Sequence, residues 1–141
     1  MQQTFLYLTL GTNDLDRAAR FYDAALAPLG LQRRATEADE VGYGHPDDTR
    51  CRLWITRPYD GKAATVGNGS MPAFAAPDRA AVDAFHSAAC ATGGTDEGAP
   101  GLRPHGPGFY AAYVRDPDGN KLSAVHQDQG SLSASAPGST P

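Results

Sequence analysis

One histidine of this chain stands among side chains that could do acid–base chemistry. His105 lies in the stretch GAPGLRPHGPG, close to Arg103 and Tyr110 in sequence. The pKa of an imidazole suits proton transfer near neutral pH, and loops often carry ligand contacts. His105 is therefore the best candidate for a catalytic residue, with Arg103 and Tyr110 as ligand contacts. The alternative is an ordinary solvent-exposed loop histidine.

The other histidines have plainer interpretations. His45 precedes a proline in a turn, and His86 follows a core phenylalanine on a predicted helix, where we expect it to face solvent. His126 comes three positions after Ser123, so in a strand the two side chains point to opposite faces. Nothing in the spacing of the histidines predicts a metal site.

Composition narrows the class of protein. The 141 residues have a net charge of −4, which gives no positive field for a nucleic-acid backbone. The longest apolar run near the start, Phe5 to Leu10, is too short for a membrane span. Cys51 and Cys90 are expected to be free, partly buried thiols. These features predict a cytoplasmic protein with no nucleic-acid or membrane partner.

The elements that position these residues can be predicted from periodicity and turn signals. A strand over Thr4 to Leu10 precedes a helix capped at Asn13-Asp14 and ended by Gly30, and three strands follow, at Leu31 to Thr36, Val41 to Gly44 and Arg52 to Thr56.

The same order of elements then begins again. A strand at Met71 to Ala75 leads into a helix that opens at Pro77-Asp78 and ends at Gly93-Gly94, and later strands are predicted at Phe109 to Arg115 and Leu122 to His126. The Asp/Pro/Gly/Asn-rich turn 116–120 joins these last two strands. The stretch Gly98 to Gly108 has so many glycines and prolines that we predict a loop there.

An internal duplication accounts for this recurrence. Three pairs of residues with matching structural roles lie 64 positions apart: Asp14 with Asp78, Phe21 with Phe85, and Gly30 with Gly94. The chain is therefore predicted to be one domain over residues 1–128, with module one at about 1–66 and module two at about 67–128. Residues 129–141 form a low-complexity tail that is predicted to be disordered.

Three motifs resemble the vicinal oxygen chelate (VOC) superfamily, which includes glyoxalase I, the bleomycin and fosfomycin resistance proteins and the extradiol dioxygenases. They are YLTLGTNDLDRAARFYDAALAPLGL from Tyr7, AFAAPDRAAVDAFHSAACATGG from Ala73, and YAAYVRDPDGNKLSAV from Tyr110. The resemblance implies an α+β fold. Two βαβββ modules in a pseudo-twofold arrangement form a curled mixed sheet, a cup that holds a metal or a ligand.

The resemblance also implies where metal ligands would stand, on the first and last strands of each module. Those positions fall on Tyr7, Trp54, Met71 and Ser123. Thioether, indole and neutral hydroxyl groups make no site for a hard divalent metal. We therefore expect no metal and no other cofactor, and a divalent metal would be present only if this interpretation is wrong.

The leading hypothesis is a metal-independent protein that binds a small organic molecule, with a resistance or sequestering role as one form of it. One alternative is an enzyme of the same fold with a non-standard active site, related to glyoxalases, fosfomycin transferases or dioxygenases. Another is a vestigial cup that serves only for dimerisation. We also expect a homodimer, because a second subunit usually covers the sheet edges of such folds.

The duplication makes a specific prediction about the side chains of the cup. Tyr7 and Met71 are equivalent through the 64-residue offset, so both should point into the cup. By alternation, Leu8 and Leu10 should then lie under the helices.

Overall fold

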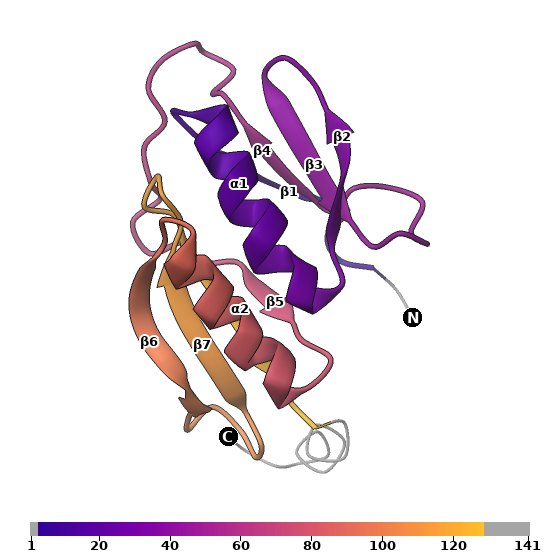
Figure 1. Ribbon diagram of the computed structural model, residues 1–141, viewed down its shortest axis with the longest axis vertical. Helices are drawn as coiled ribbons and strands as arrows, with labels where there is room; N and C mark the ends of the chain where they lie inside the picture. The colour runs from indigo at the N-terminus through magenta and orange to yellow at the C-terminus, as the bar shows by residue number, and fades with distance from the viewer. Residues whose placement is uncertain (1–2, 129–141) are drawn as a thin grey trace.

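The computed structural model describes residues 3–128 and consists of two βαβββ modules (Figure 1). The first module contains β1 (Leu8–Gly11), α1 (Leu15–Leu26), the short 3-10 helix η1 (Ala27–Leu29), β2 (Gln32–Thr36), β3 (Glu40–Gly44) and β4 (Leu53–Thr56). The second contains β5 (Ala73–Ala75), α2 (Arg79–Ala91), β6 (Thr95–Leu102), β7 (Tyr110–Arg115) and β8 (Lys121–His126). This is the α+β architecture that the sequence predicts.

Each module folds its strands into one mixed sheet with the same topology. The strand orders are β1-β4-β3-β2 and β5-β8-β7-β6, so the first strand of each module is an edge strand parallel to the last. Thr9 pairs with Trp54 in the first sheet, and Ala73 pairs with Ser123 in the second. Since Thr9 and Ala73 are 64 positions apart, Trp54 and Ser123 occupy equivalent places.

The two helices begin in the same way. The Asp14 carboxylate accepts a hydrogen bond from the backbone N–H of Arg17 at 3.0 Å, and that of Asp78 accepts one from Ala81 at 2.8 Å. Such a side chain satisfies a backbone donor that the first turn leaves free. The predicted caps are confirmed.

The helix ends match less closely. Gly30 follows η1 in the left-handed region, with φ 83°, but the left-handed residue after α2 is Gly93, with φ 98°. Gly94 is needed for a different reason, because a Cβ there would lie 2.7 Å from the Phe21 ring. The repeat is therefore shifted by one residue at this point.

The core lies between the helices and one face of each sheet. Helices α1 and α2 pack against each other on the near side of the sheets in Figure 1. Phe21 and Phe85, the repeat-matched aromatics, are both fully buried. The helices leave the other face of each sheet uncovered, and this face carries the site.

The region predicted as a loop, Gly98 to Gly108, is partly a strand. β6 extends to Leu102 and pairs with β7 through two register shifts, between Asp96 and Gly98 and between Gly98 and Gly101. Glycines permit such bulges, and a proline is tolerated in an edge strand. The turn-like composition therefore belongs to an irregular edge strand.

The missed strand also explains His86. We expected this side chain to face solvent, but it is only 17% exposed and its Nε2 lies 2.9 Å from the Asp96 carboxylate on β6.

The turn between β7 and β8 joins the two modules. The Asp118 carboxylate accepts hydrogen bonds from the Thr12 hydroxyl at 2.5 Å, the Asn13 backbone N–H at 2.9 Å and the Arg17 guanidinium at 2.8 Å. These donors surround the start of α1, where a negative charge is favourable. We call this set of contacts the module clamp.

Two neighbouring side chains extend the module clamp into the core. The Tyr22 hydroxyl donates to Asp116 at 2.5 Å, and the Asn120 amide donates to the Gly11 carbonyl at 3.0 Å. Burial, and then the negative charge of Asp116, raise the pKa of Tyr22 well above its usual value. Both contacts connect the β7–β8 turn to module one and so fix how the two sheets meet.

Within residues 3–128, no helix is long and apolar enough to cross a membrane.

Candidate functional site

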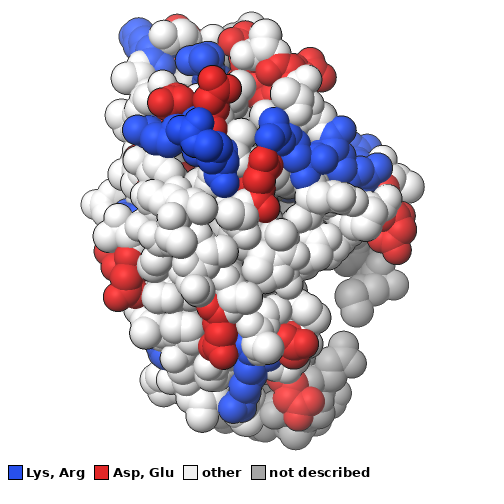
Figure 2. Space-filling view, in the orientation of Figure 1, with Lys and Arg blue, Asp and Glu red and all other residues white. Residues whose placement is uncertain are grey.

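An apolar groove lies between the edge strands β1 and β5. Its volume is about 640 Å³, and it is lined by Phe5, Leu6, Tyr7, Leu8, Thr9, Leu10, Arg52, Ser70, Met71, Pro72, Ala73 and Phe74. Figure 2 shows a hollow on the right of the view, between the modules, bordered mainly by uncharged side chains. Size and lining are those of a pocket for a small organic molecule.

Tyr7 and Met71 both line this groove, one from each module. Each lies just before its edge strand, since β1 begins at Leu8 and β5 at Ala73, later than the sequence predicts. Their side chains are not under the helices: Tyr7 is 51% exposed and Met71 40%.

The alternation of neighbouring residues fits this placement, with one exception. Leu10 and Phe74 pack against the core on the helix side, as the alternation predicts. Leu8 was expected beneath the helices as well, but it is 38% exposed and lines the groove. It is the first residue of the edge strand β1, at the border of the sheet.

Trp54 lies on the uncovered face of the first sheet. Its neighbours Leu53 and Ile55 are buried in the core, so alternation sends Trp54 to the opposite side. A Cβ at Gly42, its partner on β3, would lie 2.8 Å from the indole ring. Glycine at position 42 therefore makes room for the ring.

Ser123 lies on the corresponding face of the second sheet. It is fully buried, and its hydroxyl has no hydrogen-bond partner in the structure. The flanking Leu122 and Ala124 pack into the core beneath α2. The four positions predicted from the resemblance thus lie on the groove or on the uncovered sheet faces beside it.

These four side chains do not fit a divalent metal ion. They offer a phenol, an indole, a thioether and a neutral hydroxyl, none of which is a strong ligand for a hard cation. Across residues 3–128, no group of three or more His, Cys, Asp or Glu side chains is placed so that it could hold a metal. No chemical step through a metal follows from this set of donors.

The three other predicted site residues lie apart from the groove. His105 is exposed, and its ring packs edge-on against Phe109 at 5.3 Å between centroids. Tyr110 lies on the helix-covered face, where its hydroxyl donates to Asp83 of α2 at 2.7 Å. That hydrogen bond raises the pKa of Tyr110. The structure therefore does not bring His105 and Tyr110 together as contacts over the cup.

Arg103 does reach the uncovered face of the second sheet. Its guanidinium lies over the ring of Tyr113 on β7, 5.4 Å from the centroid, and donates to the Ala99 carbonyl at 2.6 Å. Lys121 lies over the same ring at 5.7 Å. Sequence reasoning missed Tyr113 and Lys121, although Lys121 stands two positions before Ser123 and so shares its face.

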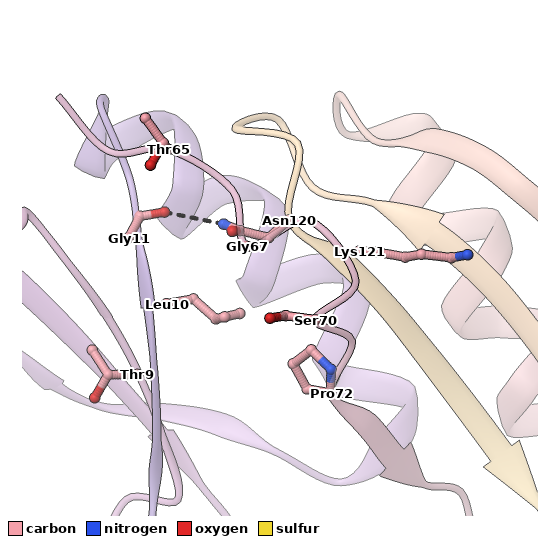
Figure 3. Close-up of a pocket in the computed structure, with 9 residues that line it drawn as sticks. All are labelled: Thr9, Leu10, Gly11, Thr65, Gly67, Ser70, Pro72, Asn120 and Lys121. Atoms are coloured by element: carbon pink, nitrogen blue, oxygen red, sulfur yellow. Dashed lines mark hydrogen bonds between the residues drawn. The ribbon is translucent and has the colours of Figure 1, made fainter.

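A smaller pocket of about 210 Å³ adjoins the groove and shares Thr9, Leu10, Ser70 and Pro72 with it. Figure 3 shows Gly11 and Asn120 joined across its far end by the hydrogen bond of the module clamp. The Lys121 side chain extends away from this pocket across β8 (Figure 3). The two pockets are thus adjacent, and Lys121, which lines the smaller one, carries its ammonium to within 5.7 Å of the Tyr113 ring centroid.

Arg52 is the cation of the groove, but it is already paired. It forms a two-pronged ion pair with Asp48, with N–O distances of 2.7 and 2.9 Å, and donates to the Leu6 carbonyl at 3.0 Å. The hydrogen bonds from Arg52 lower the pKa of Asp48 below its usual range. Arg52 thus anchors the segment before β1 and offers little free charge to a ligand.

Solved structures with the same fold come from several bacteria. A glyoxalase/bleomycin resistance protein from Albidiferax ferrireducens T118 is 41% identical, with a TM-score of 0.80 over 89% of this chain and 100% of that one. A glyoxalase-related enzyme from Fulvimarina pelagi is 23% identical, with a TM-score of 0.67 over 89% and 88% of the two chains. A lactoylglutathione lyase from Agrobacterium tumefaciens is 23% identical, with a TM-score of 0.59 over 89% and 96%.

Among curated proteins, no sequence matches this chain. The sequence pattern of the Glyoxalase/Bleomycin resistance protein/Dioxygenase superfamily matches residues 4–123, which include both modules up to Ser123. The fold, the duplicated topology and this match agree, and the chain belongs to that superfamily.

Proposed function

We propose that this protein binds a small organic molecule in the groove between β1 and β5, without a divalent metal. The observation that carries the proposal is the pairing of an apolar groove of about 640 Å³ with weak metal donors at the family's ligand positions. Burial of an apolar ligand against Tyr7, Leu8 and Met71 would supply the affinity.

Nothing in the geometry favours a catalytic role for His105. Its ring is exposed and packs on Phe109, and it is not among the residues that line the groove. A general acid or base has to come within hydrogen-bond reach of its substrate. The binding hypothesis therefore has stronger support than the enzyme alternative.

We further propose that two copies associate through the rim of the groove. Phe5 is 78% exposed and Leu6 50% exposed, and they extend the apolar surface of Tyr7 and Met71. Large apolar side chains gathered in one patch are typical of an interface. Sedimentation equilibrium at micromolar concentration should give the mass of a dimer, and the mass of one chain would contradict this proposal.

The chemistry of the cysteines supports a reducing compartment. We propose a cytoplasmic location, which the free thiols Cys51 and Cys90 support because such thiols persist in a reducing compartment.

The binding proposal can be tested with a library of small apolar and aromatic molecules, screened by NMR on protein treated with a chelator. We expect ligands to shift the signals of Tyr7, Leu8 and Met71 and to leave those of Tyr59, a fully exposed tyrosine outside the groove, unchanged. Shifts that appear only after a divalent metal is added would overturn the proposal.

A further inference from the structure

Two cations flank one aromatic ring on the uncovered face of the second sheet. Tyr113 pairs with Ser123 across β7 and β8, and its chain neighbours Ala112 and Val114 are fully buried toward the helices. The guanidinium of Arg103 lies 5.4 Å and the ammonium of Lys121 5.7 Å from the Tyr113 ring centroid.

Neither cation has a carboxylate partner among the described residues. Within residues 3–128, the Arg103 guanidinium donates only to the backbone carbonyls of Leu102 and Ala99, and no ion pair forms at Lys121. By contrast, Arg33 and Arg52 lie within 2.7 Å of an aspartate. In a chain of net charge −4, these two cations therefore stand out as lacking an ion-pair partner among the described residues.

A buried hydroxyl without a partner lies beside these cations. Ser123 is 0% exposed, and its Oγ makes no hydrogen bond. Almost every buried polar group in a folded protein is hydrogen-bonded, so an exception calls for an explanation. A ligand oxygen drawn in by Arg103 and Lys121 would give this hydroxyl an acceptor once the side chains that cover it move aside.

The β6 glycines make room for this arrangement. A Cβ at Gly98 would lie 2.9 Å from the Tyr113 ring and 3.3 Å from the Arg103 guanidinium, and one at Gly101 would lie 3.0 Å from the same guanidinium. The bulged, glycine-containing strand thus leaves the space in which the Arg103 guanidinium lies over Tyr113.

We propose that Arg103, Lys121, Tyr113 and Ser123 form a subsite for the carboxylate of the bound molecule. This inference rests on the proposed function, because the apolar part of the ligand would lie in the groove. Ala73 lines the groove and is separated from Tyr113 by two strand spacings of about 4.8 Å each, roughly 10 Å in all. The ligand is thus a small hydrophobic carboxylic acid.

Matched acids and alcohols test this proposal, because each pair shares one apolar body. Hydrocinnamate is compared with hydrocinnamyl alcohol, and octanoate with octanol, by calorimetric titration of the full chain. The acid of at least one pair should bind about tenfold more tightly than its alcohol, the size expected for a hydrogen bond to a charged group. Added salt should reduce this preference.

Three variants locate the effect. Arg103→Gln and Lys121→Gln should each remove most of the preference for the acid while leaving the affinity for the alcohol unchanged. Arg79→Gln is the matched control, since Arg79 lies over another tyrosine, Tyr110, at 5.0 Å on the helix-covered face. It should keep the preference, and circular dichroism checks that each variant is folded.

The outcomes separate this inference from the proposed function. Equal affinities for acid and alcohol would overturn the carboxylate subsite and leave the groove as a binding site. A preference that survives both Arg103→Gln and Lys121→Gln would overturn the subsite as well. If no member of either pair binds, the groove proposal and this inference both fail.

Discussion

Replacing Asp118 with alanine tests whether the module clamp holds the two sheets together. The Asp118 side chain is only 3% exposed and accepts hydrogen bonds from Thr12, Asn13 and Arg17. All three donors bind an ionised carboxylate, and a hydrogen bond to a charged group contributes about 1.5–3 kcal/mol.

These contributions have to be reduced for the donors that reach water. Arg17 is 41% exposed, and the Thr12 hydroxyl keeps a second partner, the Asp14 carbonyl, at 3.1 Å. We therefore expect Asp118→Ala to lower the free energy of unfolding by about 2–4 kcal/mol.

Urea unfolding, followed by circular dichroism and by the fluorescence of the single tryptophan, Trp54, measures this loss. The control is Asp47→Ala, an exposed aspartate in a turn, which should change stability by less than about 0.5 kcal/mol. Equal stability of the two variants would refute the view that this turn fixes the orientation of the modules.

Three further changes test other parts of the structure. Met71→Glu should abolish ligand binding but leave the melting temperature nearly unchanged, because the Met71 side chain is 40% exposed and lines the groove. If the variant fails to fold, Met71 is a core residue and this interpretation is wrong. Burial raises the pKa of Tyr22 and Tyr43, so above pH ~10 these tyrosines ionise in the unfolded chain but not in the folded one. Each should therefore lower the free energy of unfolding by about 1.4 kcal/mol per pH unit. Spectrophotometric titration should show that both ionise only when the protein unfolds. Gly98→Ala should destabilise by about 1–3 kcal/mol, because its Cβ would lie 2.9 Å from Tyr113; an unchanged urea midpoint would contradict this crowding.

The sequence was sufficient to predict the features of the fold that depend on local signals. Asp14 and Asp78 predict where the helices begin, because a capping carboxylate accepts a hydrogen bond from a backbone N–H only two or three residues away. The equivalence of Trp54 and Ser123 does not follow from the 64-residue offset alone; the pairing of β1 with β4 and of β5 with β8 establishes it. The sequence does not reveal β6, because its bulges depend on pairing with β7. A glycine-rich segment has the same composition in a loop and in a bulged edge strand.

The site was predicted less completely, for a related reason. Tyr7 and Met71 could be placed from the repeat, but Tyr113 is brought to Ser123 only by the register of β7 against β8. Tyr110 was assigned to the cup without that register, which in fact sends its side chain to α2. A shift of one residue exchanges the two faces of a strand, and composition does not reveal it.

Metal content measured together with ligand binding tests the central claim most directly. The purified protein is dialysed without chelator for elemental analysis, and a hydrophobic ligand found by the NMR screen is then titrated with and without added zinc, nickel, iron or manganese. We predict far less than one equivalent of metal per chain and the same ligand affinity under every condition. One equivalent of bound metal, or ligand binding that requires a metal, would contradict the claim that the groove binds its ligand without one.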